Sequence, residues 1–395
     1  MKRALNFLSA NRPYILLGLA VLALLAWLML YRLGTLVSGL SRQEYAAALM
    51  PVGWHGIYHD SLYLPLKAVR SVDFYFFSQH NAILTRLPNA LFGAIAVISF
   101  TWLIRLWHNR RTALIAGLLF ATGAWTLHAS RLASFDVLYL CVIPVLLLMN
   151  VALQRHTDKK SAMYASMLLW GLLIYIPGAV WMVLINAFLQ RKSITKGWTN
   201  LSAWWHKTLY VLAGVIWLPL LVYNLRDVSI LKSWLGLPAH LEGPLTLLKN
   251  FIDVFSHLFI GGPRQPDLWL GKAPILDVFT LAMFLIGLYF YAIHWRASRS
   301  KLLGSLFLAG AILVALGGPV TLSLLVPLLY IVAATGITYL IKEWLQVFPN
   351  NPIARNAGLA LIALAVILAC TYNLRAYFVA WPHNNSTITV FHYRP

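Results

Sequence analysis

Long apolar stretches separated by short polar segments recur along the whole chain of 395 residues. Many approach the roughly 20 residues that a helix needs to cross about 30 Å of hydrocarbon. The pattern predicts an all-α polytopic membrane protein with a bundle of about 11 transmembrane helices. We expect these spans at Tyr14–Tyr31, Leu87–Leu106, Thr112–Leu127, Val137–Leu153, Ala162–Ile176, Pro177–Leu189, Thr208–Asn224, Pro274–His294, Leu302–Leu316, Pro319–Ile341 and Gly358–Tyr377.

Several of these stretches are shorter than a lone span would need. We expect such helices to be packed inside the bundle, tilted, or paired as re-entrant hairpins. The clearest hairpin candidate is the break at Tyr175-Ile176-Pro177-Gly178. The first apolar stretch is longer than that of a typical signal peptide and no clear cleavage site follows it, so we interpret it as an uncleaved span.

Composition supports the membrane assignment, because 60% hydrophobic and 11% charged residues leave too little polar surface to coat a soluble globule. We expect residues 1–395 to form a single membrane domain. Its amino-terminal module would cover residues 1–190. A more variable module, residues 191–395, would contain an external loop at 225–272 and a short external carboxyl-terminal tail.

Charge predicts the orientation of the chain in the membrane. With the amino terminus inside, 18 of the 31 Lys and Arg residues but only 2 of the 11 acidic residues fall in internal segments. Basic residues favour the cytoplasmic side, so we expect a plasma-membrane protein with a cytoplasmic amino terminus and an extracytoplasmic carboxyl terminus. The net charge of +20 indicates anionic membrane lipids as partners rather than nucleic acid.

The first external loop, from Arg32 to about Arg86, is longer than a connector requires. Its aromatic residues are typical of a membrane interface, and Glu44, His59 and Asp60 interrupt them. We predict interfacial helices in this loop and in the fourth external loop.

The second external loop is short and contains Arg131 and Asp136. An isolated charge at membrane depth costs at least about 2.5–3.5 kcal/mol, so these two residues should pair or line a wet cavity. A structural salt bridge and a functional cavity both fit the sequence.

Four motifs follow one another in this part of the chain: Thr85-Arg86-Leu87-Pro88-Asn89-Ala90-Leu91-Phe92-Gly93, Arg110-Arg111, Ser130-Arg131-Leu132-Ala133 and Asp136-Val137-Leu138. Together they resemble the amino-terminal module of GT-C membrane glycosyltransferases, among them protein O-mannosyltransferases and lipid A aminoarabinose transferases. The similarity is strongest from about Leu40 to Gly178.

This resemblance implies a GT-C-like fold and a glycosyltransferase that moves a hexosyl or pentosyl group. The donor would be a dolichyl- or undecaprenyl-phosphate sugar, and the acceptor a lipid, glycan or protein at the extracytoplasmic face. A single displacement would invert the anomeric centre.

The resemblance also suggests roles for individual residues. Glu44 stands where relatives carry an Asp-Glu pair, and Asp136 matches the third acidic position, so Glu44 and Asp136 are the candidate catalytic residues, with Glu44 as the base. Asp60 lies in His59-Asp60-Ser61, where relatives have an acid near Lys-Pro-Pro, but here without the Lys.

The remaining roles concern the acceptor, a metal ion and the donor phosphate. Asp60 would orient the acceptor or, together with Asp136, hold a divalent metal ion. Arg131 and Arg86, with His59 in addition, are the candidates for binding the donor phosphate, because guanidinium groups match phosphate oxygens. The three carboxyl groups of Glu44, Asp60 and Asp136 should then face one cavity.

A polytopic transporter or lipid flippase is the alternative function. It should place ionisable groups or broken helices near the midplane in two matching halves. Here the spans are nearly free of charge, and the acidic residues gather in external loops. A structural or assembly protein would explain the hydropathy but not the grouping of Glu44, Asp60, Arg131 and Asp136.

Overall fold

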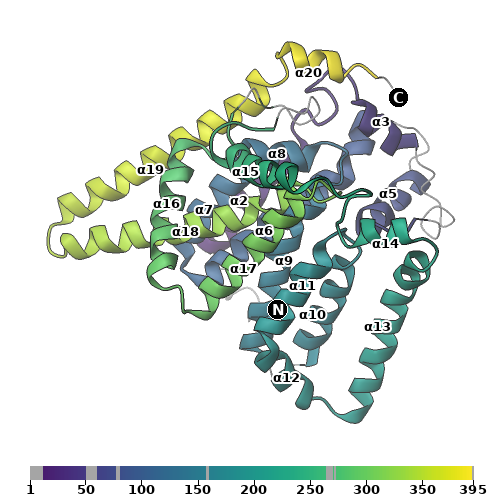
Figure 1. The fold of residues 1–395 in the computed structure, drawn as a ribbon. Helices are drawn as coiled ribbons and strands as arrows, with labels where there is room; N and C mark the ends of the chain where they lie inside the picture. Colours follow the sequence, from purple (N-terminus) through teal and green to yellow (C-terminus); the bar gives the residue numbers. More distant parts are fainter. Residues whose placement is uncertain are drawn as a thin grey trace.

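The chain folds into a bundle of α-helices, and no β-strand occurs in the part described by the computed structural model, which is residues 12–49, 60–76, 81–156, 160–263, 270 and 273–393 (Figure 1). The helices are α2 (Arg12–Leu30), α3 (Arg42–Leu49), α5 (Leu64–Phe76), α6 (Ala82–Trp107), α7 (Arg110–Thr122), α8 (Ala124–Arg131), α9 (Asp136–Arg155), α10 (Lys160–Leu173), α11 (Ala179–Leu189), α12 (Arg191–Thr199), α13 (Ala203–Asn224), α14 (Val228–Trp234), α15 (Pro244–Phe259), α16 (Val278–Ile293), α17 (Ser298–Ala315), the 3₁₀ turn η2 (Leu322–Leu324), α18 (Val326–Val347), α19 (Pro352–Arg375), the π-helical turn η3 (Ala376–Ala380) and α20 (Asn385–Val390).

The predicted all-α membrane fold is confirmed. Within the described residues, 6 helices are long and apolar enough to cross a membrane, or 7 if the bent pair α7 and α8 is one span. The count of 11 spans is not confirmed. Helices α10 and α11 have only 14 and 11 residues, about 21 and 17 Å of helix, which is less than the thickness of the hydrocarbon.

The chain breaks between α10 and α11 at the predicted position, where Gly178 adopts a positive φ of 75°. Its backbone N–H donates to the carbonyl of Trp234 at the end of α14, at 2.9 Å. The N–H of Tyr63 donates to the carbonyl of Tyr175, also at 2.9 Å. The break is therefore a junction at which α14 and the segment before α5 meet.

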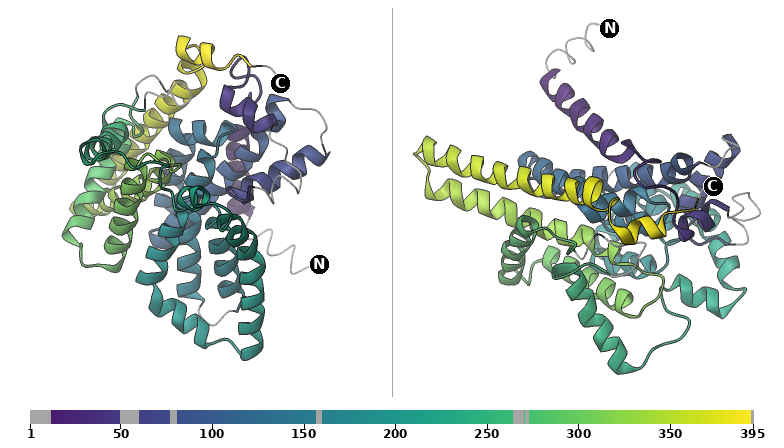
Figure 2. Two further views of the ribbon diagram at one scale, coloured as in Figure 1. Left: turned by 45° about the vertical axis from the view of Figure 1, so that its right-hand side comes forward. Right: turned by 90° about the horizontal axis from the view of Figure 1, so that it is seen from above.

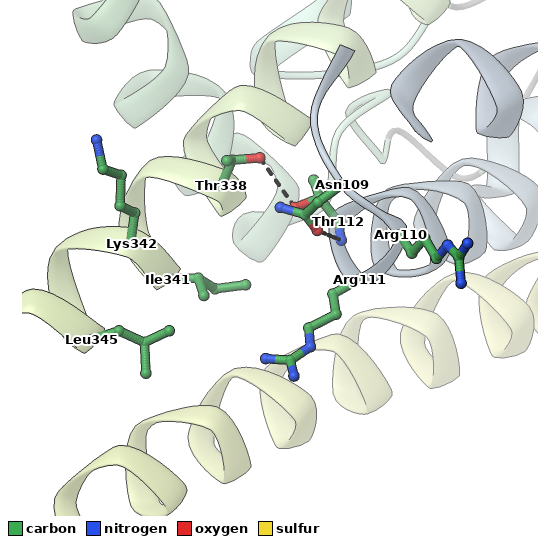
Figure 3. Close-up of a pocket in the computed structure, with 8 residues that line it drawn as sticks. All are labelled: Asn109, Arg110, Arg111, Thr112, Thr338, Ile341, Lys342 and Leu345. Carbon is green, nitrogen blue, oxygen red and sulfur yellow. Dashed lines mark hydrogen bonds between the residues drawn. The ribbon is translucent and has the colours of Figure 1, made fainter. Parts of the chain in front are cut away.

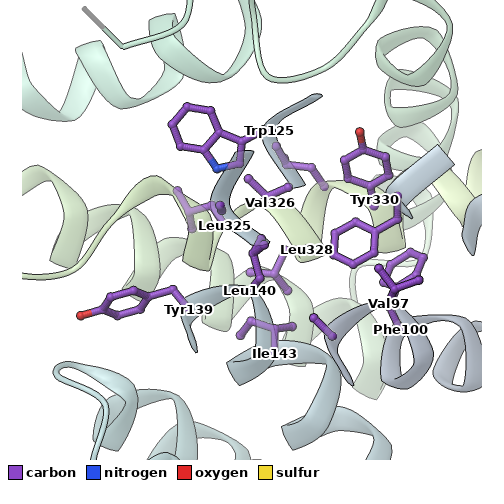
Figure 4. Packing of buried hydrophobic residues seen from close by; sticks show 14 of the residues in the cluster. Val97, Phe100, Trp125, Tyr139, Leu140, Ile143, Leu325, Val326, Leu328 and Tyr330 are labelled. Carbon is purple, nitrogen blue, oxygen red and sulfur yellow. The ribbon is translucent and has the colours of Figure 1, made fainter. Parts of the chain in front are cut away.

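Helix α9 lies at the centre of the bundle, and 83% of its most apolar 18-residue stretch is buried. It packs against α6, α8, α10 and α18. Figure 4 shows part of this core, to which these residues contribute: Val97, Phe100, Trp125, Tyr139, Leu140, Ile143, Leu325, Val326, Leu328 and Tyr330. The same hydrophobic core thus takes side chains from both halves of the sequence.

A bend of 60° separates α7 from α8. The bend occurs at Gly123, where an added Cβ would meet the hydroxyl group of Tyr330 at 2.6 Å, so a side chain there would force α8 away from α18. Helix α8 instead runs back into the protein and contacts α2 and α6. The bend therefore carries the second external loop into the bundle.

The first loop and the carboxyl-terminal segment lie at the same end of the bundle. Leu40 and Tyr393 form an isolated antiparallel bridge, and α3, α5 and α20 gather near it (Figures 1 and 2). The predicted helices in the first and fourth external loops are present as α3 and α5, and as α14 and α15.

Helices α16 and α18 touch through glycines. A Cβ added at Gly336 would overlap the backbone of Met283, and one at Gly287 would overlap that of Val332. We expect Gly336→Ala to separate the two helices and lower the free energy of unfolding by about 1–3 kcal/mol. Gly214→Ala in α13 is the matched control, because a Cβ there meets nothing within 4 Å. Thermal unfolding in detergent would measure both, and equal melting temperatures would contradict this packing.

Candidate functional site

Glu44 and Arg86 form a buried ion pair that ties the first loop to α6. The Nε and Nη2 groups of Arg86 each donate to one carboxylate oxygen of Glu44, both at 2.8 Å. The guanidinium also donates to the carbonyl oxygens of Leu33 and Gly39, both at 3.0 Å. Both side chains are 2% exposed. A donor phosphate could therefore reach Arg86 only by displacing these partners.

The remaining lone pairs of Glu44 are also occupied. Its Oε2 accepts the N–H of Ser41 at 3.1 Å while Ser41 Oγ accepts the N–H of Glu44 at 3.2 Å, a capping box at the start of α3. Its Oε1 accepts the N–H of Ala133 at 2.9 Å. A carboxylate offers about four acceptor positions, and all four are filled here. In this arrangement Glu44 anchors the second loop and has no lone pair free for a substrate proton.

Arg131 is buried beneath the end of α2, at 1% exposure. Its two Nη groups donate to the carbonyl oxygens of Leu28 and Tyr31, and its guanidinium lies 4.9 Å from the ring centroid of Phe378. A cation is favourable at the carbonyl end of a helix. Arg131 forms no ion pair with Asp136 in the described part of the chain, where the two ion pairs are Lys67–Asp60 and Arg86–Glu44.

Helix α5 and the residues before it pack directly on the second loop. The rings of Tyr63 and Phe135 stack with their centroids 4.0 Å apart. Arg70 donates to Oδ1 of Asn89 at 3.1 Å, and the Nδ2 group of Asn89 donates to the carbonyl of Ser134 at 2.5 Å. These contacts hold α5 and the segment before it against Ser134 and Phe135, the two residues that precede Asp136.

Lys67 of α5 pairs with Asp60 and was not among the phosphate-binding residues expected from the sequence motifs. Its Nζ lies 2.6 Å from Oδ2 of Asp60, and it also donates to the Asp60 carbonyl at 3.0 Å. Burial lowers the pKa of Lys67 below its ordinary 10.5, although Asp60 opposes the change. Lys67 and Arg70 are three residues apart, so α5 presents both on one face. Helical spacing after Asp60 was the signal that could have identified them.

Asp136 begins α9 and is 7% exposed, with Ser134 and Thr321 beside its carboxyl group. Its Oδ1 forms no hydrogen bond of ordinary geometry among the described residues, although the hydroxyl groups of Ser134 and Thr321 lie near enough to stabilise the charged carboxylate. The buried Nε groups of Arg70 and Arg131 also lack a partner there. Buried polar atoms are nearly always paired, so each exception calls for an explanation such as a ligand or a catalytic role.

Tyr63 connects the two acidic residues of this site. Burial raises the pKa of Tyr63 to about 12, and both Asp136 and Asp60 lie close enough to add to the rise. Its hydroxyl is 3.3 Å from that of Tyr139, which donates to the carbonyl of Pro319 at 3.0 Å. Asp60 and Asp136 thus each lie within electrostatic range of Tyr63, whereas Glu44 is enclosed in its own network.

The described residues do not by themselves form a cluster of ligands for a divalent cation. Among the described residues, no three His, Cys, Asp or Glu side chains come close enough to hold a metal ion. Oδ2 of Asp60 is paired with Lys67, and Oδ1 accepts the N–H of Leu62 at 3.2 Å. Asp136 is then the expected metal ligand that keeps an oxygen open, and one or two carboxylates hold Mg²⁺ only together with water and substrate phosphate. His59, the other predicted phosphate ligand, lies outside the described residues.

No family model and no curated protein matches this chain. Several solved structures match this chain. ArnT from Cupriavidus metallidurans in the apo state, a lipid A aminoarabinose transferase, matches with a TM-score of 0.55 at 13% identity, over 97% of this chain and 77% of ArnT. The same protein bound to undecaprenyl phosphate gives 0.54 at 13% identity, over 96% and 77%.

The oligosaccharyltransferase from Archaeoglobus fulgidus, in complex with Zn and sulfate, also matches this chain. The TM-score is 0.53 at 18% identity, over 91% of this chain and 53% of the archaeal protein, so the chain spans about half of that enzyme. Such identities establish a likeness of fold, and they confirm the GT-C-like architecture that the sequence motifs implied.

Proposed function

We propose that this chain, whose fold is that of GT-C membrane glycosyltransferases, transfers a sugar from a polyprenyl-phosphate donor to an acceptor hydroxyl. The proposal rests on two buried atoms that form no hydrogen bond in the described part of the chain, Asp136 Oδ1 at the end of the second loop and Arg70 Nε on α5, which packs on that loop. An acceptor hydroxyl would complement the carboxylate oxygen, and a phosphate oxygen would complement the guanidinium N–H.

Lys67 and Arg70 are the residues that we assign to the donor phosphate. Lys67 retains N–H capacity beyond its contacts with Asp60, and Arg70 has its Nε free of any partner among the described residues. Undecaprenyl phosphate bound to ArnT supports a donor of this chemical class. Arg86 and Arg131, the arginines first expected to bind phosphate, would instead position the first and second loops.

Asp136 is the residue that we assign as the general base. Its free carboxylate oxygen would take the proton of the acceptor hydroxyl while the acceptor oxygen bonds to the anomeric carbon. The bond between that carbon and the phosphate oxygen breaks in the same step, and the lipid phosphate leaves with the electron pair, held by Lys67 and Arg70. One displacement of this kind inverts the anomeric centre. Asp60 would orient Lys67.

We place this site at the extracytoplasmic face of the plasma membrane. The support is the distribution of charge along the sequence, together with the bridge between Leu40 and Tyr393, which puts the first loop and the carboxyl-terminal segment at one end as that topology requires. Experiment must identify the sugar, which we expect to be a hexosyl or pentosyl group. It must also identify the acceptor, which we expect to be a lipid, glycan or protein.

The decisive experiment uses the full chain in proteoliposomes with a panel of radiolabelled polyprenyl-phosphate sugars and mixed acceptors. We expect label to move from one donor to an acceptor, with inverted configuration by NMR. A transporter or flippase would instead move the labelled lipid across the bilayer with its sugar still attached. Transfer that is absent for every donor, in protein that remains folded, would overturn the proposal.

Lys67→Gln and Arg70→Gln should each raise the KM for the donor about 10- to 100-fold, because a hydrogen bond to a charged group is worth about 1.5–3 kcal/mol. Arg42→Gln, which replaces an exposed cation at the same end of the bundle, is the matched control.

The donor affinity should also depend on pH. The charged form of Lys67 binds phosphate, so donor affinity persists below the lowered pKa of Lys67 and falls as the pH rises through that pKa. Steady-state kinetics against pH would measure this, and a donor KM unchanged in both variants would rule out this phosphate site.

A further inference from the structure

Two cavities lie next to each other at the end of the bundle opposite the candidate site. One, of about 510 Å³, lies among the connection from α6 to α7, the turn from α16 to α17, and α18. Its surface is mainly apolar, but basic and hydroxyl-bearing residues stand around it, including His108, Tyr291, His294, Arg299, Ser300 and Lys342. The other, of about 730 Å³, is mainly apolar and lies among α15, α16, α17 and α18. Tyr291 and Ser300 line both, so the two cavities are neighbours.

The first cavity, of about 510 Å³, is lined by the cations Arg299 and Lys342 and by no carboxylate. Arg299 and Lys342 are exposed, and neither has an ion-pair partner in the described part of the chain. Arg299 is held in place over the ring of Trp107, with its guanidinium carbon 5.1 Å from the centroid. A neighbouring hollow of about 520 Å³ adds Arg111 of α7, which Figure 3 shows across from Lys342. The charges therefore suit an anion from outside the protein.

The second cavity is a groove that follows α16 from Leu281 to Ala292, about 16 Å at 1.5 Å per residue. Leu285 and Leu288 line it and remain 55% and 48% exposed, so its side is open to the surroundings. Gly304 of α17 also lines it, and a Cβ added there meets nothing within 4 Å. A single acyl chain fits this length and this apolar surface.

We infer that the two cavities form one binding site for an anionic phospholipid of the adjacent leaflet. Arg299 and Lys342 hold its phosphate, and one acyl chain lies along the groove beside Gly304. The cations complement the negative charge of such a leaflet. The bound lipid links the turn between α16 and α17 to α18 and stabilises the folded bundle, because it binds the folded state alone. This site is separate from the donor site at the other end.

The experiment measures lipid retention by native mass spectrometry after exchange into detergent with phosphatidylglycerol or phosphatidylcholine. We expect the wild type to retain phosphatidylglycerol and to melt at a higher temperature in its presence. Arg299→Gln combined with Lys342→Gln should weaken this retention roughly 30-fold. Lys301→Gln combined with Arg355→Gln removes two exposed cations outside both cavities and should leave retention unchanged.

Gly304→Leu provides a second variant, because it fills the groove where space is open and leaves both cations in place. We expect it to abolish retention while the protein still unfolds cooperatively. Equal retention by the wild type and the Arg299 and Lys342 variant would overturn the inference, as would equal losses in the control variant. It would also fail if inorganic phosphate alone raised the melting temperature as much as phosphatidylglycerol. None of these readouts depends on glycosyl transfer.

Discussion

Asp136→Asn should lower the rate of sugar transfer about 10²- to 10⁴-fold, the usual contribution of a general base. The amide has nearly the same shape as the carboxyl group but cannot accept a proton from the acceptor. Because the donor phosphate is assigned to Lys67 and Arg70, the KM for the donor should stay close to that of the wild type. The melting temperature should change little, since Oδ1 of Asp136 has no partner to lose among the described residues.

Asp227→Asn is the matched control for this substitution. Asp227 is exposed and caps α14 by accepting the N–H of Ser229 at 3.0 Å, and asparagine caps helices about as well as aspartate does. We expect full activity from it. If Asp136→Asn also kept the full rate, the base would have to be another residue, while the assignment of the fold would stand.

Glu44→Gln is expected to act on stability, lowering the free energy of unfolding by about 3–5 kcal/mol. The substitution leaves the guanidinium of Arg86 buried without its counter-charge. The amide group of glutamine also brings N–H donors into a position surrounded by other donors, so at least one hydrogen bond made by the carboxylate is lost. The loss should appear as a lower melting temperature in detergent. Turnover per folded molecule should fall less than in Asp136→Asn, because Glu44 holds the second loop through Ala133 and our proposal assigns the proton to Asp136.

A double variant separates the two readings of Glu44. Combining Glu44→Gln with Arg86→Met removes both charges. The melting temperature of this double variant should be closer to that of the wild type than the melting temperature of Glu44→Gln alone. Suppose instead that Glu44→Gln melted like the wild type and lost turnover as severely as Asp136→Asn. Glu44 would then be the base, as its place in the sequence first suggested, and our assignment to Asp136 would be wrong.

Buried polar and charged side chains hold the segment that leads to Asp136. Glu44 accepts a hydrogen bond from Ala133, and Asn89 donates one to Ser134. Arg131 donates to the carbonyl of Leu28 and so fixes the end of α8 beneath α2. A loop held at consecutive positions cannot rearrange readily when charge develops during transfer. Such preorganisation is a major source of electrostatic catalysis.

The sequence by itself determined the class of fold. Apolar stretches of spanning length and the scarcity of charge allow only a helical membrane bundle, because every backbone polar group must be paired within lipid. Local chemistry also fixed the break at Gly178, since glycine adopts a positive φ without strain. The motifs around Arg86, Arg131 and Asp136 pointed to the region where the loops converge.

Only the tertiary structure decided which charged residues are free to act. Glu44 and Asp136 are both single acids at the start of a helix, and nothing local distinguishes them. Arg86, 42 positions away from Glu44, fills two of its acceptor positions, whereas Asp136 keeps one oxygen open. Hydropathy is a local property, but a hydrogen-bond partner depends on how α5, α6 and the second loop pack. For the same reason Lys67 became a candidate phosphate ligand only once α5 was placed on that loop.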